Sequence, residues 1–422
     1  MYKKSGLDNG LRVITSRLEG ARSVSLGFWI NIGSRYEAPG ISGISHYLEH
    51  LLFKGSKKYS CSGIKESIEG VGGSLNGFTS EELTCYLVKI PARHLDKSLD
   101  ILSDMVLAPR LNNSDVEKER TVILEELKMY RDLPQSYVYE LLDGLLWPGQ
   151  PLGSPVIGSV DSVSGITPGD LKSFCKRHYT PVNTVLSAAG SIEHDALVKK
   201  VSGIFSGCRT GSKNVFAGAS CGQDKSRLCV LDKPTEQTHM AMGFHSLRRG
   251  DPLRHAQVLL NVILGANMSS RLFNEVREKR GLAYEIGSGM KRYYDTGVFL
   301  VHAGIDNRKV VPCIDLVLKE LEKTKDRLVS EDEFRRAKEF YLGQLMLTLE
   351  DTMEYMLWMG EGVACLDRVN TFEEIAGEVS KVKREDLRCL ARRIFKREKI
   401  NLSLIGPLEK EKKRILSSLN LR

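Results

Sequence analysis

The chain has 422 residues, of which 41% are hydrophobic and 27% are charged, and it carries a formal net charge of +8. This composition is typical of a soluble globular protein, and the length predicts two domains or more. Lys and Arg alternate with Asp and Glu and form no basic tract, which argues against nucleic-acid binding.

The sequence also argues against secretion and membrane insertion. No apolar run approaches the roughly 18 residues of a membrane span, and the N-terminus lacks the apolar region of a secretory signal. The nine cysteines are scattered and form no C-x-x-C pair, so neither a disulfide framework nor a cysteine zinc site is indicated. We therefore expect a protein of the reducing cytoplasm.

Predicted strands and helices follow one another in a mixed order along the chain. Residues 133–163 hold several Gly and Pro residues and are expected to wrap around the first domain. Residues 208–226 contain few apolar residues and are interpreted as an interdomain linker. Predicted strands cover residues 11–14, 23–30, 84–90 and 183–189, and predicted helices cover 64–71, 94–107, 114–131 and a segment that opens at 167–170.

One short stretch, His46-Tyr47-Leu48-Glu49-His50, has the pattern of a metal-binding helix. His46 and His50 lie one turn apart and project from the same helix face, and two neutral imidazoles so placed can bind a tetrahedral ion such as zinc. Glu49 beside them can accept a proton from the water that the metal activates. The order H-x-x-E-H is the inverted form of the metalloprotease motif H-E-x-x-H. The alternative is a pair of ordinary surface histidines.

A zinc site needs a third protein ligand, and the helical run at residues 117–130 offers several glutamates. Glu119 and Glu126 are seven residues apart, which places them two turns apart on one helix face. Glu125 points about 100° away from Glu126 and is the competing choice.

These two stretches together resemble the pitrilysin family of metallopeptidases, which includes insulin-degrading enzyme and the mitochondrial processing peptidase. The resemblance implies one zinc ion per chain, held by His46, His50 and Glu126. It further implies that Glu49 is the general base and that Glu119 is a second catalytic-site glutamate, which supports the ligands. The length is similar to that of the half-length bacterial members of the family.

The resemblance extends to the residues on both sides of the metal helix. Residues 33–37 look like the family's approach to this helix. Residues 72–80 look like its substrate-binding edge strand, which implies that Asn76 and Thr79 contact the substrate. The alternative for Asn76 to Thr79 is a Gly-flanked turn without a ligand.

A later segment, residues 265–284, is also similar to the family. In the family an Arg and a Tyr seven residues apart in such a segment contact the substrate, and they match Arg277 and Tyr284. Arg280 is the rival arginine. The alternative for the pair is a salt-bridged Arg at a helix end and a packed Tyr.

The second half of the chain repeats the first at a spacing of 216 residues. Leu26-Gly27-Phe28 corresponds to Met242-Gly243-Phe244, and Asp170 corresponds to Asp386. The sequence therefore predicts an α+β fold of two homologous α/β-sandwich domains, each a mostly antiparallel sheet covered by helices. At the same spacing the second copy lacks the ligands, because the equivalent positions are Val262, Gly265, Ala266 and Leu342.

We thus expect residues 1–207 to form a catalytic zinc-binding domain and residues 227–422 to form a non-catalytic substrate-binding domain. The resemblance implies a zinc-dependent endopeptidase that hydrolyses peptides or unfolded polypeptides in a chamber formed by a homodimer. The rival interpretations are a non-catalytic scaffold and a chain that works in a heterodimer with a separate substrate-binding subunit. The complete motif argues against the first, and the presence of Arg277 and Tyr284 argues against the second.

Overall fold

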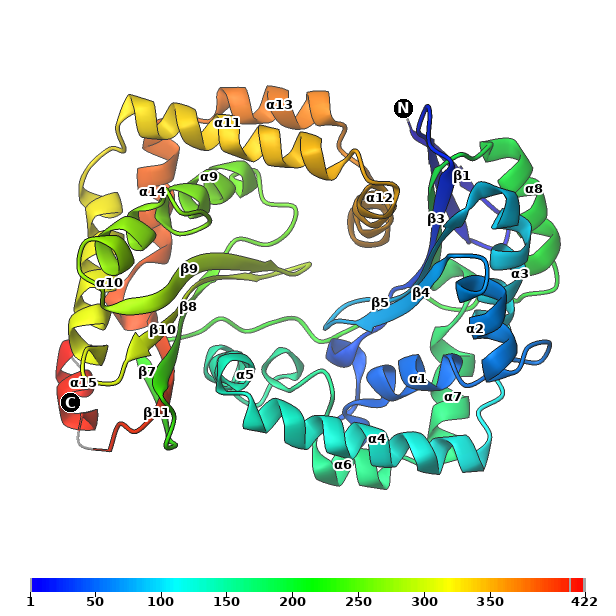
Figure 1. The fold of residues 1–422 in the computed structure, drawn as a ribbon, viewed down its shortest axis with the longest axis horizontal. Coiled ribbons are helices and arrows are strands. Elements are labelled where there is room, and N and C mark those ends of the chain that lie inside the picture. The colour runs from blue at the N-terminus through cyan, green and yellow to red at the C-terminus, as the bar shows by residue number, and fades with distance from the viewer. Residues whose placement is uncertain (1, 410, 420–422) are drawn as a thin grey trace. The chain divides into compact units, whose positions relative to one another are not determined.

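The computed structural model describes residues 2–409 and 411–419, which group into two compact units (Figure 1). Unit 1 comprises Met1–Lys128, Ser154–Ala217 and Met346–Asn370. Unit 2 comprises Met129–Gly153, Gly218–Leu345 and Thr371–Arg422. Each unit therefore includes one segment from the other half of the sequence.

Unit 1 is built on a six-stranded sheet with the order β1-β2-β6-β3-β5-β4, in which only β2 and β6 are parallel neighbours. Its strands are β1 (Tyr2–Gly6), β2 (Arg12–Arg17), β3 (Ser23–Ile30), β4 (Ser74–Thr79), β5 (Thr84–Pro91) and β6 (Thr184–Gly190). Its helices are α1 (Ile44–Leu52), α2 (Cys61–Glu69), α3 (Leu95–Leu107), most of α4 (Asn113–Asp132), α6 (Val160–Gly165), α7 (Pro168–His178), α8 (His194–Phe205) and α12 (Thr352–Leu366).

Unit 2 is built on a five-stranded sheet with the order β7-β11-β8-β10-β9, in which only β7 and β11 are parallel neighbours. Its strands are β7 (Arg227–Asp232), β8 (Gln237–Ser246), β9 (Ala283–Arg292), β10 (Gly297–Asp306) and β11 (Asn401–Gly406). Its helices include α5 (Pro134–Leu146), α9 (Arg254–Leu264), α10 (Val310–Asp326), α11 (Glu331–Thr348), α13 (Phe372–Lys381), α14 (Arg384–Ile394) and α15 (Lys412–Ser418).

The two sheets share one topology, which confirms the predicted α+β class with two mostly antiparallel sheets. If β2, β6, β3, β5 and β4 are matched with β7, β11, β8, β10 and β9, the strand orders are the same, and the single parallel pair falls in the same place. Strand β1 is an addition at the edge of the first sheet. The 216-residue spacing also holds for helix boundaries, since α7 begins at Pro168 and α14 at Arg384.

Residues 133–163 do not wrap around the first domain as the sequence analysis expected. They include α5, whose apolar residues Val138, Leu142 and Leu146 pack on the sheet of unit 2 against Ala241, Leu300 and other residues of β8, β10 and β11. The equivalent helix from the second half, α12, packs on the sheet of unit 1. The Gly and Pro residues that suggested a loop lie mainly after α5, between residues 148 and 158.

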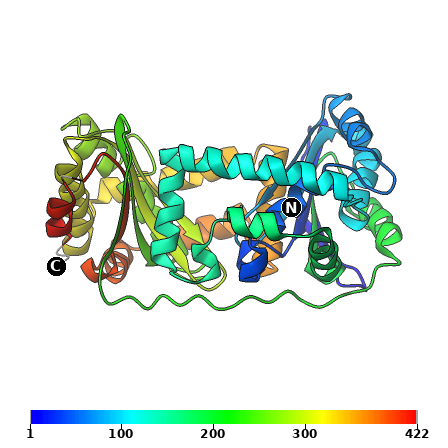
Figure 2. The same ribbon diagram turned by 90° about the horizontal axis from the view of Figure 1, so that it is seen from below.

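The segment between α8 and β7 contains no helix or strand (Figure 2). It includes residues 208–226, which we interpreted as a linker, and the change from unit 1 to unit 2 falls at Ala217 and Gly218. Within residues 2–409 and 411–419, no helix combines the length and the apolar character needed to cross a membrane.

Helix α12 packs closely on unit 1 because two glycines leave room at the contact. The Trp29 indole of β3 donates a hydrogen bond to Ser187 Oγ at 2.9 Å, and Gly360 of α12 lies directly over this pair. A Cβ atom on Gly360 would overlap Trp29 Nε1 and would lie 2.6 Å from Ser187 Oγ. A Cβ atom on Gly27 would lie 2.5 Å from Met356 Sδ, so both sides of the contact exclude a side chain.

Replacing Gly360 by Ala should therefore destabilise the fold. We expect Gly360→Ala to lower the free energy of unfolding by about 1–3 kcal/mol through overpacking, as measured by urea denaturation. Gly144 is a glycine of α5 that does not face a sheet, and a Cβ atom there would meet nothing nearer than Gly153 O at 3.8 Å. Gly144→Ala is thus the matched control, and it should be neutral or slightly stabilising because Ala favours helices. Equal stability of the two variants would contradict the proposed contact.

Candidate metal centre

Helix α1 holds the H-x-x-E-H residues on one face because its other face is buried. Tyr47, Leu48 and Leu52 are fully buried in unit 1, whereas His46, Glu49 and His50 are only half-buried. The spacing of the apolar residues thus determines that both histidines and Glu49 face the same partly open region.

The start of α1 is fixed by Glu37, whose role the sequence analysis missed. Gly43 precedes the helix with a φ of 93°, and the Glu37 carboxylate accepts hydrogen bonds from the backbone N–H groups of Gly43 at 2.7 Å and Ser45 at 2.8 Å. These are donors that a helix N-terminus otherwise leaves without partners. Burial raises the pKa of Glu37, although these hydrogen bonds oppose the shift. A glutamate shortly before a glycine was the only sequence signal for this cap.

The structure brings His46, His50 and Glu126 together at the contact between α1 and α4. One donor atom from each residue lies within 4.8 Å of the others. Glu126 Oε2 lies 3.8 Å from His46 Nε2 and 3.5 Å from His50 Nε2. Two imidazole nitrogens and a carboxylate oxygen that converge in this way match the donor set of catalytic zinc sites. Glu125, the competing choice, is exposed and pairs with Lys128 at 2.7 Å.

The two histidines differ in charge because their surroundings differ. Burial and the neighbouring His50 lower the pKa of His46 to about 4, although Glu126 opposes the shift. Burial alone would also lower the pKa of His50, but hydrogen bonds to Glu119 and Glu126 outweigh it and raise this pKa to about 9. At neutral pH the metal-free protein therefore contains a neutral His46 and a charged His50.

Glu119 contacts His50 from the side away from Glu126. Its Oε2 lies 3.1 Å from His50 Nδ1, and its Oε1 accepts a hydrogen bond from Lys54 Nζ at 2.6 Å. Glu119 is 5% exposed; burial opposes its charge, but His50 and Lys54 together lower its pKa. A carboxylate on the second nitrogen of a histidine fixes the ring so that its other nitrogen can bind a metal. By contrast, His46 Nδ1 is buried and has no hydrogen-bond partner among the described residues.

Glu49 lies beside this cluster and has a neutral partner. It accepts a hydrogen bond from Thr79 Oγ1 at 2.6 Å. Burial raises the pKa of Glu49, and the Thr79 hydrogen bond only partly offsets this effect. A carboxylate whose pKa lies above its ordinary value is a better proton acceptor near neutral pH.

The stretch at residues 72–80 contains an edge strand, so the interpretation of Asn76 to Thr79 as a turn is wrong, and the contact with substrate stays a prediction. Within this stretch β4 spans Ser74–Thr79 and pairs only with β5, so its other side is unpaired within the described sheet. Asn76 is exposed, and its Oδ1 accepts a hydrogen bond from the N–H of Gly77. Thr79 at the end of the strand reaches Glu49, which links the edge strand to the metal helix.

Arg277 and Tyr284 lie in unit 2, where they contact each other. The Arg277 guanidinium lies 5.5 Å from the centre of the Tyr284 ring and 4.6 Å from that of Phe273. Tyr284 is 74% exposed, which is contrary to the alternative of a packed tyrosine. The rival Arg280 pairs with Glu275 at 2.6 Å.

Two known protein families match this chain, and together they cover most of its length. Residues 12–160 match the family described as "Insulinase (Peptidase family M16)", and residues 165–341 match the family described as "Peptidase M16 inactive domain". The chain therefore belongs to peptidase family M16, as a half-length member. The resemblance drawn from the two helices is confirmed.

The same conclusion follows from individual relatives. The chain is 36% identical over 420 residues to an uncharacterized zinc protease of Streptomyces coelicolor, covering 96% of this chain and 90% of that protein. It is 35% identical to the uncharacterized zinc protease YmxG of Bacillus subtilis, covering 96% and 98%. In fold it is similar to a protease from Helicobacter pylori, with a TM-score of 0.91 and 24% identity over 96% of this chain and 100% of that chain.

The structure corrects how the repeat aligns with the metal helix. Seven residues separate β8 from α9, whereas 13 separate β3 from α1, so the spacing of 216 falls by six at this point. Counted from the helix starts, His46, Glu49 and His50 correspond to Ala256, Leu259 and Leu260 rather than to Val262, Gly265 and Ala266. Neither set can bind zinc, so the conclusion that the second copy lacks these ligands holds.

Zinc binding should release a proton at neutral pH. Because the pKa of His50 is raised to about 9, the charged imidazole must lose its proton to bind a metal, whereas His46 is already neutral. We expect about one proton released per zinc at pH 7, and zinc affinity that rises roughly tenfold per pH unit between about pH 6 and 8. Competition with a chromophoric chelator at several pH values measures this slope.

Glu119→Gln tests the cause of the shift, because it removes a carboxylate that raises the pKa of His50. The pH slope of zinc affinity should become shallower in this variant. Glu125→Gln alters an exposed carboxylate on the same helix and should leave the slope unchanged. A wild-type affinity that does not vary with pH, after correction for the chelator, would show that His50 is neutral in the metal-free protein.

Proposed function

We propose that this protein is a zinc-dependent endopeptidase that hydrolyses peptides or unfolded polypeptides. The observation that carries the proposal is the convergence of His46, His50 and Glu126 with Glu49 beside them. Membership of family M16 and the zinc-protease names of its relatives support it. One zinc ion per chain would be held by the two imidazoles and the Glu126 carboxylate.

Each residue near the site has a defined task in this proposal. Zinc bound there would act as a Lewis acid that polarises the scissile carbonyl and lowers the pKa of the attacking water. Glu49 accepts the proton of that water and later passes it to the leaving amine. Its raised pKa suits both steps, because the group must bind and release a proton near neutral pH. Glu119 is a positioning residue, which orients the His50 ring through Nδ1.

The substrate would bind as an extended strand along β4. Its backbone would form hydrogen bonds with the unpaired side of this strand near Asn76 and Thr79, a mode that depends on the peptide backbone more than on side chains. Arg277 and Tyr284 would contact a substrate carbonyl and stabilise its developing negative charge. The exposure of Tyr284 is consistent with a ligand contact.

The assembly is proposed by analogy with long family members whose two halves enclose a chamber. Two copies of this chain would form a homodimer in which Arg277 and Tyr284 serve the zinc site of the other copy. The catalytic role of residues 1–207, the substrate-binding role of residues 227–422 and the cytoplasmic location stay predictions. Light scattering measures the oligomeric state of the active protein. A monomer with full activity would exclude the proposed homodimer.

Glu49→Gln tests the central claim, because it removes the proton acceptor but keeps the size of the side chain. Wild type should cleave members of a quenched fluorescent peptide library. The variant should bind the same amount of zinc and lose at least about 100-fold in kcat. Zinc content is measured on both proteins by atomic absorption.

The other outcomes of this experiment distinguish the rival functions. If neither protein binds zinc, the metal site is wrong. If wild type binds zinc but cleaves no peptide, a scaffold or a chain that needs a separate subunit becomes the better interpretation. Glu125→Gln is the matched control, since it alters the neighbouring exposed glutamate and should leave both zinc content and cleavage unchanged.

A further inference from the structure

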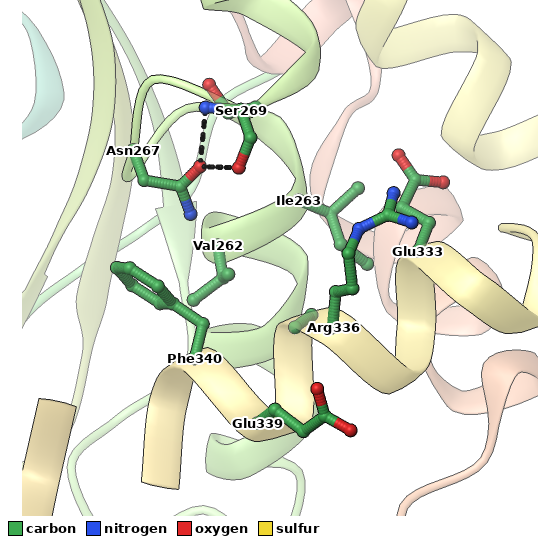
Figure 3. A pocket seen from close by; sticks show the side chains of 10 residues that line it. Val262, Ile263, Asn267, Ser269, Glu333, Arg336, Glu339 and Phe340 are labelled. Carbon is green, nitrogen blue, oxygen red and sulfur yellow. Dashed lines mark hydrogen bonds between the residues drawn. The ribbon is translucent and has the colours of Figure 1, made fainter. Parts of the chain in front are cut away.

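Unit 2 contains a cavity of about 290 Å³ between α9 and α11 (Figure 3). Its apolar wall is formed by Val262, Ile263 and Phe340, and its polar wall comes from the loop after α9 and from α11. This volume is near the lower end for small-molecule sites and suits a ligand the size of an amino acid. The polar residues that line it are Asn267, Ser269, Ser270, Glu333, Arg336 and Glu339.

One cation at this cavity, Arg336, has no ion pair. Glu333 accepts two hydrogen bonds from Arg271, at 2.7 and 2.6 Å. Glu339 lies 3.8 Å from Arg335, which also pairs with Asp332 at 3.2 Å. Arg336 is exposed and has no hydrogen bond or ion pair with any residue in the part of the chain that the structure describes, and its side chain extends along the cavity in Figure 3.

Two further polar groups at the cavity also lack partners. Asn267 Oδ1 accepts hydrogen bonds from the N–H and the hydroxyl of Ser269, but its Nδ2 donates none to the described residues. Ser270 is 2% exposed, and its hydroxyl is buried without a hydrogen-bond partner there. Buried polar groups nearly always have a partner, so an unsatisfied one at a cavity indicates a place where a ligand or water completes the bonding.

We propose that this cavity binds a small apolar carboxylate. The carboxylate pairs with Arg336 and accepts a hydrogen bond from Asn267 Nδ2, while the apolar part contacts Phe340 and Val262. The chemistry fits two sources, a free apolar amino acid and the C-terminal residue of a short peptide. The site is separate from the residues proposed for catalysis and does not depend on zinc.

Ligand-detected NMR titration of the full chain with N-acetyl-L-leucine tests the proposal, with N-acetyl-L-leucinamide as the uncharged match. The acid should bind saturably and the amide at least about tenfold more weakly. Arg336→Gln should weaken binding of the acid by a similar factor. Arg308→Gln removes another exposed arginine of unit 2, which pairs with Asp306 and does not line the cavity, and should leave binding unchanged. Asn267→Ala should weaken binding as a second, independent variant.

Three results would overturn the proposal: no saturable binding up to about 10 mM, equal binding of acid and amide, or equal effects of the two arginine variants. The source of the ligand follows from comparing L-leucine with N-acetyl-glycyl-L-leucine. Tighter binding of the free amino acid identifies a metabolite site, and tighter binding of the peptide identifies a peptide C-terminus. Either result supports the carboxylate site. Because the titration measures binding alone, its failure leaves the proposed peptidase function untouched.

Discussion

The candidate metal centre depends on one contact, the packing of α1 against α4 through Tyr47. This residue lies between the two histidines, is fully buried, and donates a hydrogen bond from its hydroxyl to Val116 O at 2.5 Å. Glu119 and Glu126 follow Val116 by three and ten residues, a spacing that keeps all three near one face of α4. The hydrogen bond that joins the helices therefore also sets the two glutamates opposite the histidines.

The two halves of the chain share one architecture and differ in the side chains that their helices carry. Each sheet is covered on one face by a helix from the other half of the sequence, α12 in unit 1 and α5 in unit 2. The candidate metal ligands lie on α1 and α4, and α9, the counterpart of α1, carries Ala256, Leu259 and Leu260 in place of His46, Glu49 and His50. The two sheets keep the same strand order although only unit 1 carries this cluster. The candidate site is therefore separate from the strand pairing that the two copies share.

The sequence was sufficient for features set by local geometry and insufficient for those set by distant contacts. The spacing of His46 and His50 and the face shared by Glu119 and Glu126 follow from helical periodicity alone. The choice of Glu126 over Glu125 needed the family resemblance, and in the structure Glu126 lies beside both histidines whereas Glu125 is exposed. The position of α5 could not be predicted, since its apolar residues are matched by strands about 100 residues or more away in sequence. The alignment of the repeat at the metal helix was wrong for a similar reason. The loop before α9 is shorter than the loop before α1, and the matches at the two ends of the repeat do not reveal this difference.

Four glutamates lie on or beside α1, and their partners explain why Glu49 is the best candidate for proton transfer. Glu37 is held by two backbone N–H groups at the helix start, and both of its oxygens are occupied. Glu119 lies between a lysine and a histidine, and Glu126 faces both imidazoles, so positive charge stabilises the ionised form of each. Glu49 alone combines burial, a single neutral hydroxyl partner and a position beside the cluster, and its pKa is raised. The four groups are chemically identical, and their different surroundings fit the proposed roles of a helix cap, an orienting group, a ligand and a base.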